Sequence, residues 1–320
     1  TLTSTDSTKI RSVTGNAGDG IRASTTGSGA MVITTGTVTG SGAAGNTSSG
    51  IIATSTGGAA ITVNTTGVIS GDATGNAAGT GAAGVSAKTS GGNGSVVVTS
   101  NPTSAVLPSV VTGSVSAGNF GIVAASAGTG STTVTNNVAV TATGAGAVNA
   151  GTGPVGISAT GGTGGGAVGA ATGVTVNANA NVTANAGRAI VTNSANNATV
   201  IIAAGVTAKG LGDATHAVVD LTSVAGATTS LTNNGLITSI NPAPTVAVPT
   251  PSAYADLAVL NTGGALTFAN NGTLLGRLNG AAGQAVTMTN TSFTSWHTTG
   301  TSSFSPGADT LTNSGLIATN

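Results

Sequence analysis

The hydrophobic positions of this chain recur in one phrase, in which a glycine precedes an apolar residue, any residue and an alanine. The first copy is Gly20-Ile21-Arg22-Ala23. The leading apolar residues of successive copies are Ile21, Ile51, Val85, Ile122, Ile157, Ile190 and Val219. Their spacing of about 30 to 37 residues predicts a stacked repeat architecture, in which each unit buries its apolar side against its neighbours.

Each repeat continues with short alternating segments. β-Branched and polar residues alternate in Ile61–Val63 and Thr133–Thr135, and a third segment such as Thr37–Thr39 follows a turn. Alternation with a period of two, bounded by Gly and Asn, is typical of strands. We therefore expect three strands of about three to five residues per repeat, which together form one triangular coil of a β-solenoid.

The last third of the chain uses a second phrase, in which Asn, then Asn or Ser, then Gly separates two apolar segments. Its copies are Leu231–Ile237, Phe268–Leu274 and Leu311–Ile317. We expect Asn233, Asn234 and Gly235 to form a corner between two strands rather than a ligand site, because Asn and Gly tolerate the left-handed backbone conformation. Equivalent Asn side chains of stacked coils are expected to hydrogen-bond to one another.

The predicted fold is all-β, a parallel β-helix of about 10 to 12 irregular coils that would form a rod about 50 Å long. Repeats occupy residues 1–240, and residues 253–320 continue the solenoid with the Asn-Gly corners. Proline cannot donate to a strand ladder, so the proline-rich residues 241–252 are expected to leave the solenoid as a loop or strap. This candidate partner-contact loop contains Pro242, Pro244, Pro249 and Pro251.

The composition supports a β-solenoid and argues against a helical protein. The chain has 53 Gly among 320 residues, an apolar fraction of 39% and an aromatic fraction of 2%, and it lacks Glu. Helical proteins normally cover their outer faces with Glu, Lys, Gln and Arg, whereas Thr, Ser and Asn take the polar positions here. Columns of stacked aliphatic side chains also leave little room for aromatic rings.

Charge and cysteine content exclude several classes of function. Seven Lys and Arg balance seven acidic residues without any basic cluster, which argues against binding to nucleic acid and to anionic lipid. The absence of Cys excludes disulfides and thiolate metal sites. No apolar run is long enough to span a bilayer, and the first residues lack the apolar region of a signal peptide. We expect both ends to be processing or cutting points in a longer precursor.

The segment Phe293–Phe304, followed by Gly307–Ile317 with its Asn-Ser-Gly corner, resembles the passenger domains of bacterial autotransporters, the type V secreted proteins. The bias toward Gly, Thr, Ser, Ala and Asn is similar across essentially the whole chain. This resemblance implies a right-handed parallel β-helix on, or shed from, a Gram-negative outer surface, and a role in adhesion, autoaggregation or biofilm formation. Because no stretch of these residues resembles the family's signal sequence or membrane barrel, we expect the chain to be a passenger fragment or a released passenger.

Candidate chemistry is sparse. Asp213, His216 and Asp220 lie within eight residues and are a candidate metal or acid/base cluster, although an Asp that satisfies turn amides is the simpler interpretation of Asp213. Tyr254 and Trp296 are candidate glycan-stacking aromatics, and Trp296 is alternatively a core plug. A polysaccharide-active site would gather several Asp, Lys or Arg in one groove. The cations that would serve it are dispersed along the chain, at Lys88, Arg188, Lys209 and Arg277.

Threonine pairs raise a further binding hypothesis. Thr-x-Thr pairs in register on a flat solenoid face would suit ice binding. The pairs Thr37/Thr39, Thr54/Thr56 and Thr141/Thr143 fall at different points of their repeats, which argues against it.

The sequence thus predicts a non-enzymatic, cofactor-free stalk or adhesive surface, located extracellularly or on the bacterial outer surface. Its expected partners are host or neighbouring cell surfaces, matrix glycans or further copies of itself. The alternatives are a subunit of a self-assembling extracellular filament or sheath and, less favoured, a polysaccharide-binding or polysaccharide-active β-helix.

Overall fold

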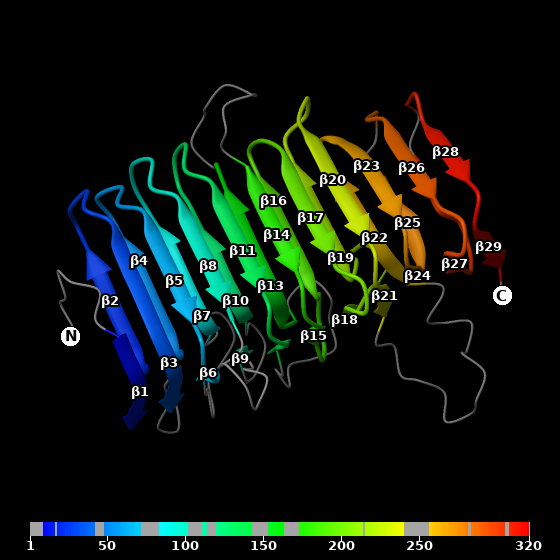
Figure 1. Ribbon diagram of the computed structural model, residues 1–320. Helices are drawn as coiled ribbons and strands as arrows, with labels where there is room; N and C mark the ends of the chain where they lie inside the picture. Colours follow the sequence, from blue (N-terminus) through cyan, green and yellow to red (C-terminus); the bar gives the residue numbers. More distant parts are fainter. Residues whose placement is uncertain are drawn as a thin grey trace.

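The structure is a computed structural model, and it describes residues 9–16, 18–41, 48–71, 83–101, 111–113, 120–142, 153–162, 173–213, 215–239, 256–280, 283–304 and 307–319. These residues form strands and no helix, so the described part holds no helix that could cross a membrane. The strands stack side by side along one long axis, with the two termini at opposite ends (Figure 1). All pairings between strands are parallel, which confirms the predicted all-β solenoid.

The chain visits three stacks of strands in turn and then repeats the order. The first sheet has nine strands. Its strands are β2 (Ile21–Thr25), β4 (Ile51–Ser55), β7 (Ala83–Thr89), β10 (Phe120–Ala125), β13 (Val155–Gly161), β16 (Ile190–Ser194), β19 (Val219–Ser223), β22 (Leu257–Thr262) and β25 (Arg277–Asn279).

The second and third sheets share β1 (Lys9–Asn16) and β3 (Met31–Ser41), because the first half of β3 pairs with β5 and its second half with β6. The second sheet continues through β5 (Ile61–Thr65), β8 (Val96–Ser100), β11 (Thr132–Asn136), β14 (Val174–Ala178), β17 (Ala198–Ile202), β20 (Thr228–Asn233), β23 (Ala265–Asn270), β26 (Val286–Asn290) and β28 (Thr310–Asn313). The third continues through β6 (Ile69–Gly71), β9 (Val111–Gly113), β12 (Val140–Ala142), β15 (Val182–Ala184), β18 (Thr207–Gly210), β21 (Leu236–Ser239), β24 (Thr273–Leu275), β27 (Ser295–Thr298) and β29 (Leu316–Thr319).

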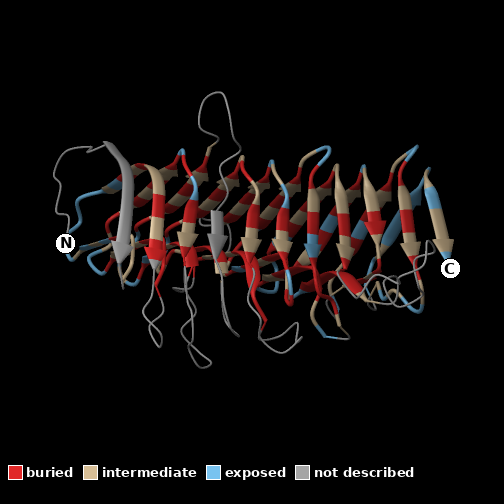
Figure 2. Ribbon diagram, turned by 90° about the horizontal axis from the view of Figure 1, so that it is seen from below, coloured by how far each residue is buried: buried red, intermediate tan, exposed pale blue. Residues whose placement is uncertain are grey.

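The register confirms the repeat identified in the sequence. Ile21 pairs with Ile51 and Ile51 with Val85, and the same column runs on through the remaining leading apolar residues to Val219. Buried and partly exposed residues alternate along the strands (Figure 2), so inward aliphatic side chains form continuous columns. The solenoid continues on both sides of residues 241–252, which themselves lie outside the described residues. The handedness and number of coils stay predictions.

The glycine of the repeated phrase is required by packing between the first and third sheets. A Cβ added to Gly50 would lie 2.6 Å from Ile69 Cγ2 and 2.7 Å from the Gly84 carbonyl oxygen. At Gly20 it would lie 2.4 Å from Val38 Cγ1. Contacts this short exclude any side chain, so the phrase keeps its glycine where two sheets approach most closely.

The Asn-Gly corners form, but one expectation about their backbone is wrong. Among the described residues Phe293 is the only non-glycine with positive φ, and Gly235 and Gly272 lack positive φ as well. These glycines are needed because neighbouring coils touch there: a Cβ on Gly272 would lie 2.1 Å from the Gly235 carbonyl oxygen. Close approach of stacked backbones, rather than left-handed conformation, explains the motif.

The predicted asparagine ladder is present at these corners. Asn233 Nδ2 donates to Asn270 Oδ1 at 2.8 Å, Asn270 Nδ2 to Asn290 Oδ1 at 2.7 Å, and Asn290 Nδ2 to Asn313 Oδ1 at 2.8 Å. Asn233, Asn270 and Asn290 are fully buried. Each internal amide therefore exchanges water for a hydrogen bond to the next coil, which fixes the register of the stack.

Candidate functional site

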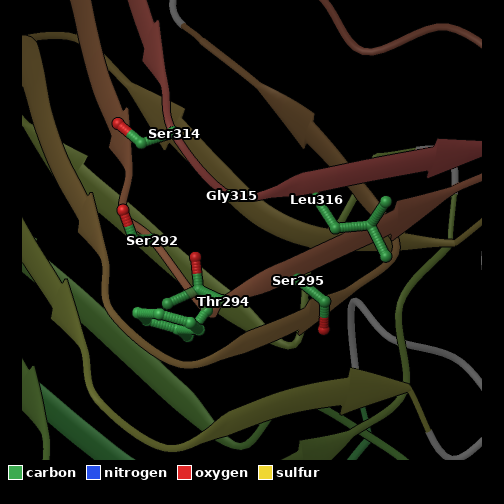
Figure 3. Close-up of a pocket in the computed structure, with 7 residues that line it drawn as sticks. Ser292, Thr294, Ser295, Ser314, Gly315 and Leu316 are labelled. Carbon is green, nitrogen blue, oxygen red and sulfur yellow. The ribbon is translucent and has the colours of Figure 1, made fainter.

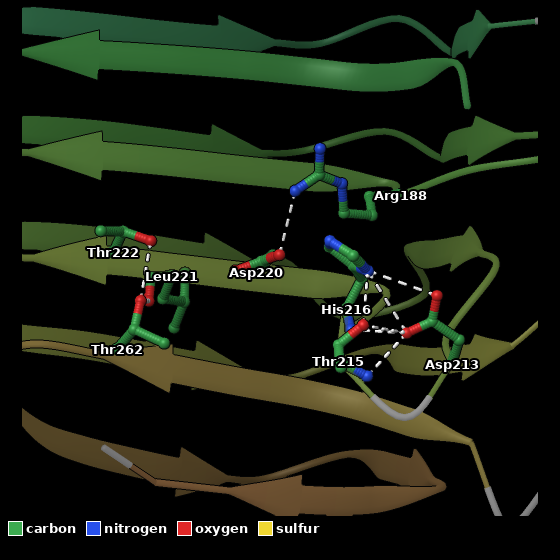
Figure 4. Close-up of polar contacts among 8 residues, drawn as sticks. All are labelled: Arg188, Asp213, Thr215, His216, Asp220, Leu221, Thr222 and Thr262. Atoms are coloured by element: carbon green, nitrogen blue, oxygen red, sulfur yellow. Dashed lines mark hydrogen bonds and ion pairs between the residues drawn. The ribbon is translucent and has the colours of Figure 1, made fainter. Parts of the chain in front are cut away.

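Asp213 and His216 meet in a tight turn ahead of the first sheet (Figure 4). Asp213 Oδ1 accepts hydrogen bonds from the Thr215 and His216 backbone amides at 2.7 and 2.8 Å, and His216 Nδ1 lies 3.3 Å from both carboxylate oxygens. Burial alone would raise the pKa of Asp213, but the hydrogen bonds from these amides and side chains lower it below its usual value. Asp213 therefore satisfies turn amides, as the simpler interpretation predicts.

Asp220 is directed to a different partner. Its Oδ2 accepts from Arg188 Nη1 at 3.0 Å, and the two side chains are 9% and 18% exposed, so this ion pair is largely removed from water (Figure 4). Burial raises the pKa of Asp220, and the Arg188 guanidinium offsets this only in part. A carboxylate engaged by a guanidinium in this way holds strands β16 and β19 together and is not presented to a metal ion.

The structure therefore does not bring Asp213, His216 and Asp220 together around one ion. Within the described ranges no group of three His, Cys, Asp or Glu side chains is arranged to hold a metal. Lys88 lies on β7 of the first sheet and Lys209 on β18 of the third. Arg277 lies on β25, also in the first sheet but with five strands between it and β7, and Arg188 is paired with Asp220. These cations therefore do not gather in one groove of the described residues, as uronate chemistry would need.

The candidate aromatic and proline sites separate into two groups. Trp296 is buried at 3% exposure, its Nε1 donates to the Gly276 carbonyl at 2.9 Å, and its ring packs 6.3 Å from Phe304. It is the core plug that the sequence offered as an alternative, and its ring is not presented to a glycan. Tyr254 and the contact-loop prolines, Pro242, Pro244, Pro249 and Pro251, lie outside the described residues.

The exposed aromatic in this region is one that the sequence reasoning missed. Phe293 is fully exposed, with φ of 67°. It lies in the corner between β26 and β27, which is longer than the corresponding corners of the adjacent coils. Ser292 and Thr294, its chain neighbours, are labelled in Figure 3. Thr294 anchors this corner, donating to the Thr291 carbonyl at 2.6 Å and to Asn290 Oδ1 at 3.0 Å. Phe293 lines a surface pocket together with Ser314, Leu316 and neighbouring hydroxyls. The length of the corner is the sequence signal that could have revealed this residue. Two more residues lie between Asn290 and Ser295 than between Asn313 and Leu316 of the next coil.

The most regular surface of the described residues is the outer face of the second sheet, here called the threonine face. Each strand contributes two outward positions, and the pairing register aligns them into two columns. The threonines of the first column are Thr62, Thr133, Thr175, Thr199, Thr267, Thr287 and Thr310, and those of the second are Thr34, Thr99, Thr135, Thr232, Thr289 and Thr312. The remaining positions are Val32, Val97, Ser230, Asn64, Asn177, Ile201 and Ala269.

The threonine face corrects the sequence argument about threonine register. Thr37 and Thr39 lie in the second half of β3, Thr54 on β4 of the first sheet and Thr141 on β12 of the third, so these pairs do fall on different elements. A different set of threonines, on the strands of the second sheet, is aligned in register. Superposing the repeats on the second strand instead of on isolated Thr-x-Thr pairs would have shown it.

Comparison of the chain with protein-family models, with curated proteins and with solved structures finds no match. The function is therefore argued from the surfaces described above.

Proposed function

We propose that this protein is a non-enzymatic, extracellular β-solenoid that serves as a stalk and adhesive surface, in the manner of an autotransporter passenger. The observation that carries the proposal is the combination of a continuous stack of coils with long polar outer faces. Asp213, Thr215 and His216 do meet, but the Asp213 carboxylate is occupied by turn amides. In the part of the chain that the structure describes, no group of three metal-ligating side chains converges. Such a molecule presents repeated contacts rather than one reactive centre.

The mechanism follows from repetition. Each coil offers outward Thr, Ser and Asn groups that form individually weak hydrogen bonds with a partner. Because the coils are rigidly spaced by the strand ladders, the second and later contacts form at high effective concentration once the first is made. Weak contacts then sum to stable attachment to a cell surface or to matrix glycans, and no single residue dominates binding.

The experiment is attachment of the purified chain, coupled to beads, to bacterial and host cells and to immobilised neutral glycans. The loop variant, with residues 241–252 replaced by a Gly-Ser linker of equal length, separates contact through the loop from contact through the solenoid faces. Retention of beads by one of these surfaces is the expected result. Failure to bind any cell, any glycan or another copy of the chain would refute the function and leave only the fold.

Negative-stain electron microscopy over a concentration series separates this proposal from the filament alternative. Isolated rods of about 50 Å are expected for a stalk. Long fibres would instead favour a self-assembling filament or sheath, because parallel coils that pair end to end continue the ladder. Compact globules would contradict the solenoid itself.

A further inference from the structure

The threonine face repeats one residue type in register, which a surface that adheres through many different weak contacts does not need. Thr133 pairs with Thr175 and Thr175 with Thr199, so three threonines follow one another across adjacent strands. The same column contains Thr267, Thr287 and Thr310 in direct succession toward the C-terminal end. All these residues are half-buried or exposed. The array runs along the rod, and on β11, β26 and β28 both outward positions are threonine, so there it extends along the strands as well.

From β3 to β28 the outward positions of the threonine face carry no charged side chain, whereas the other two faces do carry charge. The outward columns of the first sheet contain Arg22 and Lys88, and that of the third contains Lys209. At the N-terminal end of the threonine face, β1 places Lys9 at the register position of Thr34. A surface that binds ions, acidic glycans or charged proteins would use charge, so the uncharged stretch from β3 to β28 points to a neutral ligand.

The spacing of the outward side chains is that of any parallel sheet, and the aligned threonines are what distinguish this face. Adjacent strands lie about 4.8 Å apart, and outward residues two positions apart on one strand are separated by about 6.7 Å. Both distances are close to repeats of the oxygen lattice in ordinary ice. Threonine is stiff at χ1, so each side chain holds a methyl and a hydroxyl group in a fixed direction. The methyl groups limit the freedom of adjacent water and the hydroxyl groups anchor it by hydrogen bonds.

We propose that the threonine face is an ice-binding surface, which orders a layer of water that merges with the ice lattice. The ligand is a crystal surface of neutral water, and adsorption is polyvalent, so every aligned row adds to attachment. The inference rests on the proposed non-enzymatic binding role, and it assigns one face of the rod to one ligand. Adhesion through the loop or through the other faces is independent of it.

The test uses the full chain, fluorescently labelled, with pure ice as the probe. A cooled probe grows an ice hemisphere in dilute protein solution, and the fraction incorporated into ice is compared with that left in the liquid. Ice recrystallisation in a frozen sucrose solution provides a second readout. We expect the wild-type chain to be enriched in the ice and to slow recrystallisation.

The matched variants are Thr175→Lys and Thr160→Lys. Thr175 lies in the middle of the threonine face, whereas Thr160 is an outward, half-buried residue of β13 whose strand neighbours Ala125 and Asn193 are uncharged. A lysine at 175 would hold the central rows away from a flat crystal, so the ice-bound fraction should fall by about tenfold or more. Thr160→Lys should leave it unchanged. Circular dichroism and thermal unfolding check that both variants fold.

Exclusion of the wild-type chain from growing ice would overturn the proposal. Equal loss of ice binding in both folded variants would also overturn it, because the threonine face would then not be the binding surface. If Thr175→Lys instead converts a dimer into a monomer in sedimentation and ice is never bound, the face is an interface between copies of the chain. Cell and glycan attachment of Thr175→Lys, measured in parallel, shows whether the adhesive function survives when ice binding fails.

Discussion

The buried asparagine ladder offers the sharpest test of how the coils are held in register. Asn270 is the middle residue of the ladder and is fully buried. Asn270→Ala removes two short hydrogen bonds between coils, one accepted from Asn233 at 2.8 Å and one donated to Asn290 at 2.7 Å, together with a long contact of 3.5 Å from Nδ2 to the Ser295 carbonyl. At about 1 kcal/mol net for each bond, the expected loss of stability is about 2 kcal/mol.

The hydrogen bonds that Asn233 and Asn290 retain mean that the expected loss of stability is no larger than this. After the substitution, Asn233 Nδ2 still donates to the Thr273 carbonyl at 3.0 Å, and Asn290 Oδ1 still accepts from the Thr294 hydroxyl at 3.0 Å. Neither partner becomes a buried polar group without a hydrogen bond, so the penalty of an orphaned group does not add to the loss.

The adjacent residue provides the control. Asn271 is exposed and makes a single 3.0 Å bond to Asn234 of the neighbouring coil, so Asn271→Ala should change stability by no more than about 0.5 kcal/mol. Urea denaturation followed by circular dichroism measures both variants, and hydrogen exchange of β23 and β26 amides detects local opening, because solenoid stability is a sum over neighbouring coils. Equal effects of the two substitutions would refute the assignment of stability to the buried ladder.

Three further predictions use other parts of the structure. Phe293→Gly should raise stability by about 1 kcal/mol in thermal unfolding, because Phe293 is fully exposed and held at a positive φ that glycine adopts without strain; a loss of stability would show that its ring is packed. Ile61→Asp places an unpaired charge in a fully buried column and should prevent proper folding, whereas Thr37→Ala should stay within about 0.5 kcal/mol in the same urea assay; equal tolerance would contradict the strand assignment. Burial raises the pKa of Asp220 above 3.8, so the folded chain binds this proton more tightly than the unfolded chain, and stability should fall as pH rises through the raised pKa. Asp220→Asn should flatten that part of the pH profile of stability, and an unchanged slope would contradict the shift.

The candidate site shows where sequence reasoning stops. The short segment containing Asp213, His216 and Asp220 suggested a cluster, but Asp213 and His216 lie in the turn ahead of β19, whereas Asp220 lies on that strand and is directed to the preceding coil. Asp220 instead meets Arg188, which is 32 residues away and one coil below. Trp296 likewise faces inward because it occupies the core column between Leu274 and Ile317.

The sequence by itself determined the coil. The spacing of Ile21, Ile51 and Val85 fixes the repeat, and two-residue alternation fixes which side chains point inward, because both depend only on local geometry and on the need to bury aliphatic groups. Only the tertiary structure decided which outward residues become neighbours. Loops of unequal length hide that register in the sequence, and the hydrogen-bonded ladders restore it, bringing Thr133 beside Thr175 although 42 residues of chain separate them.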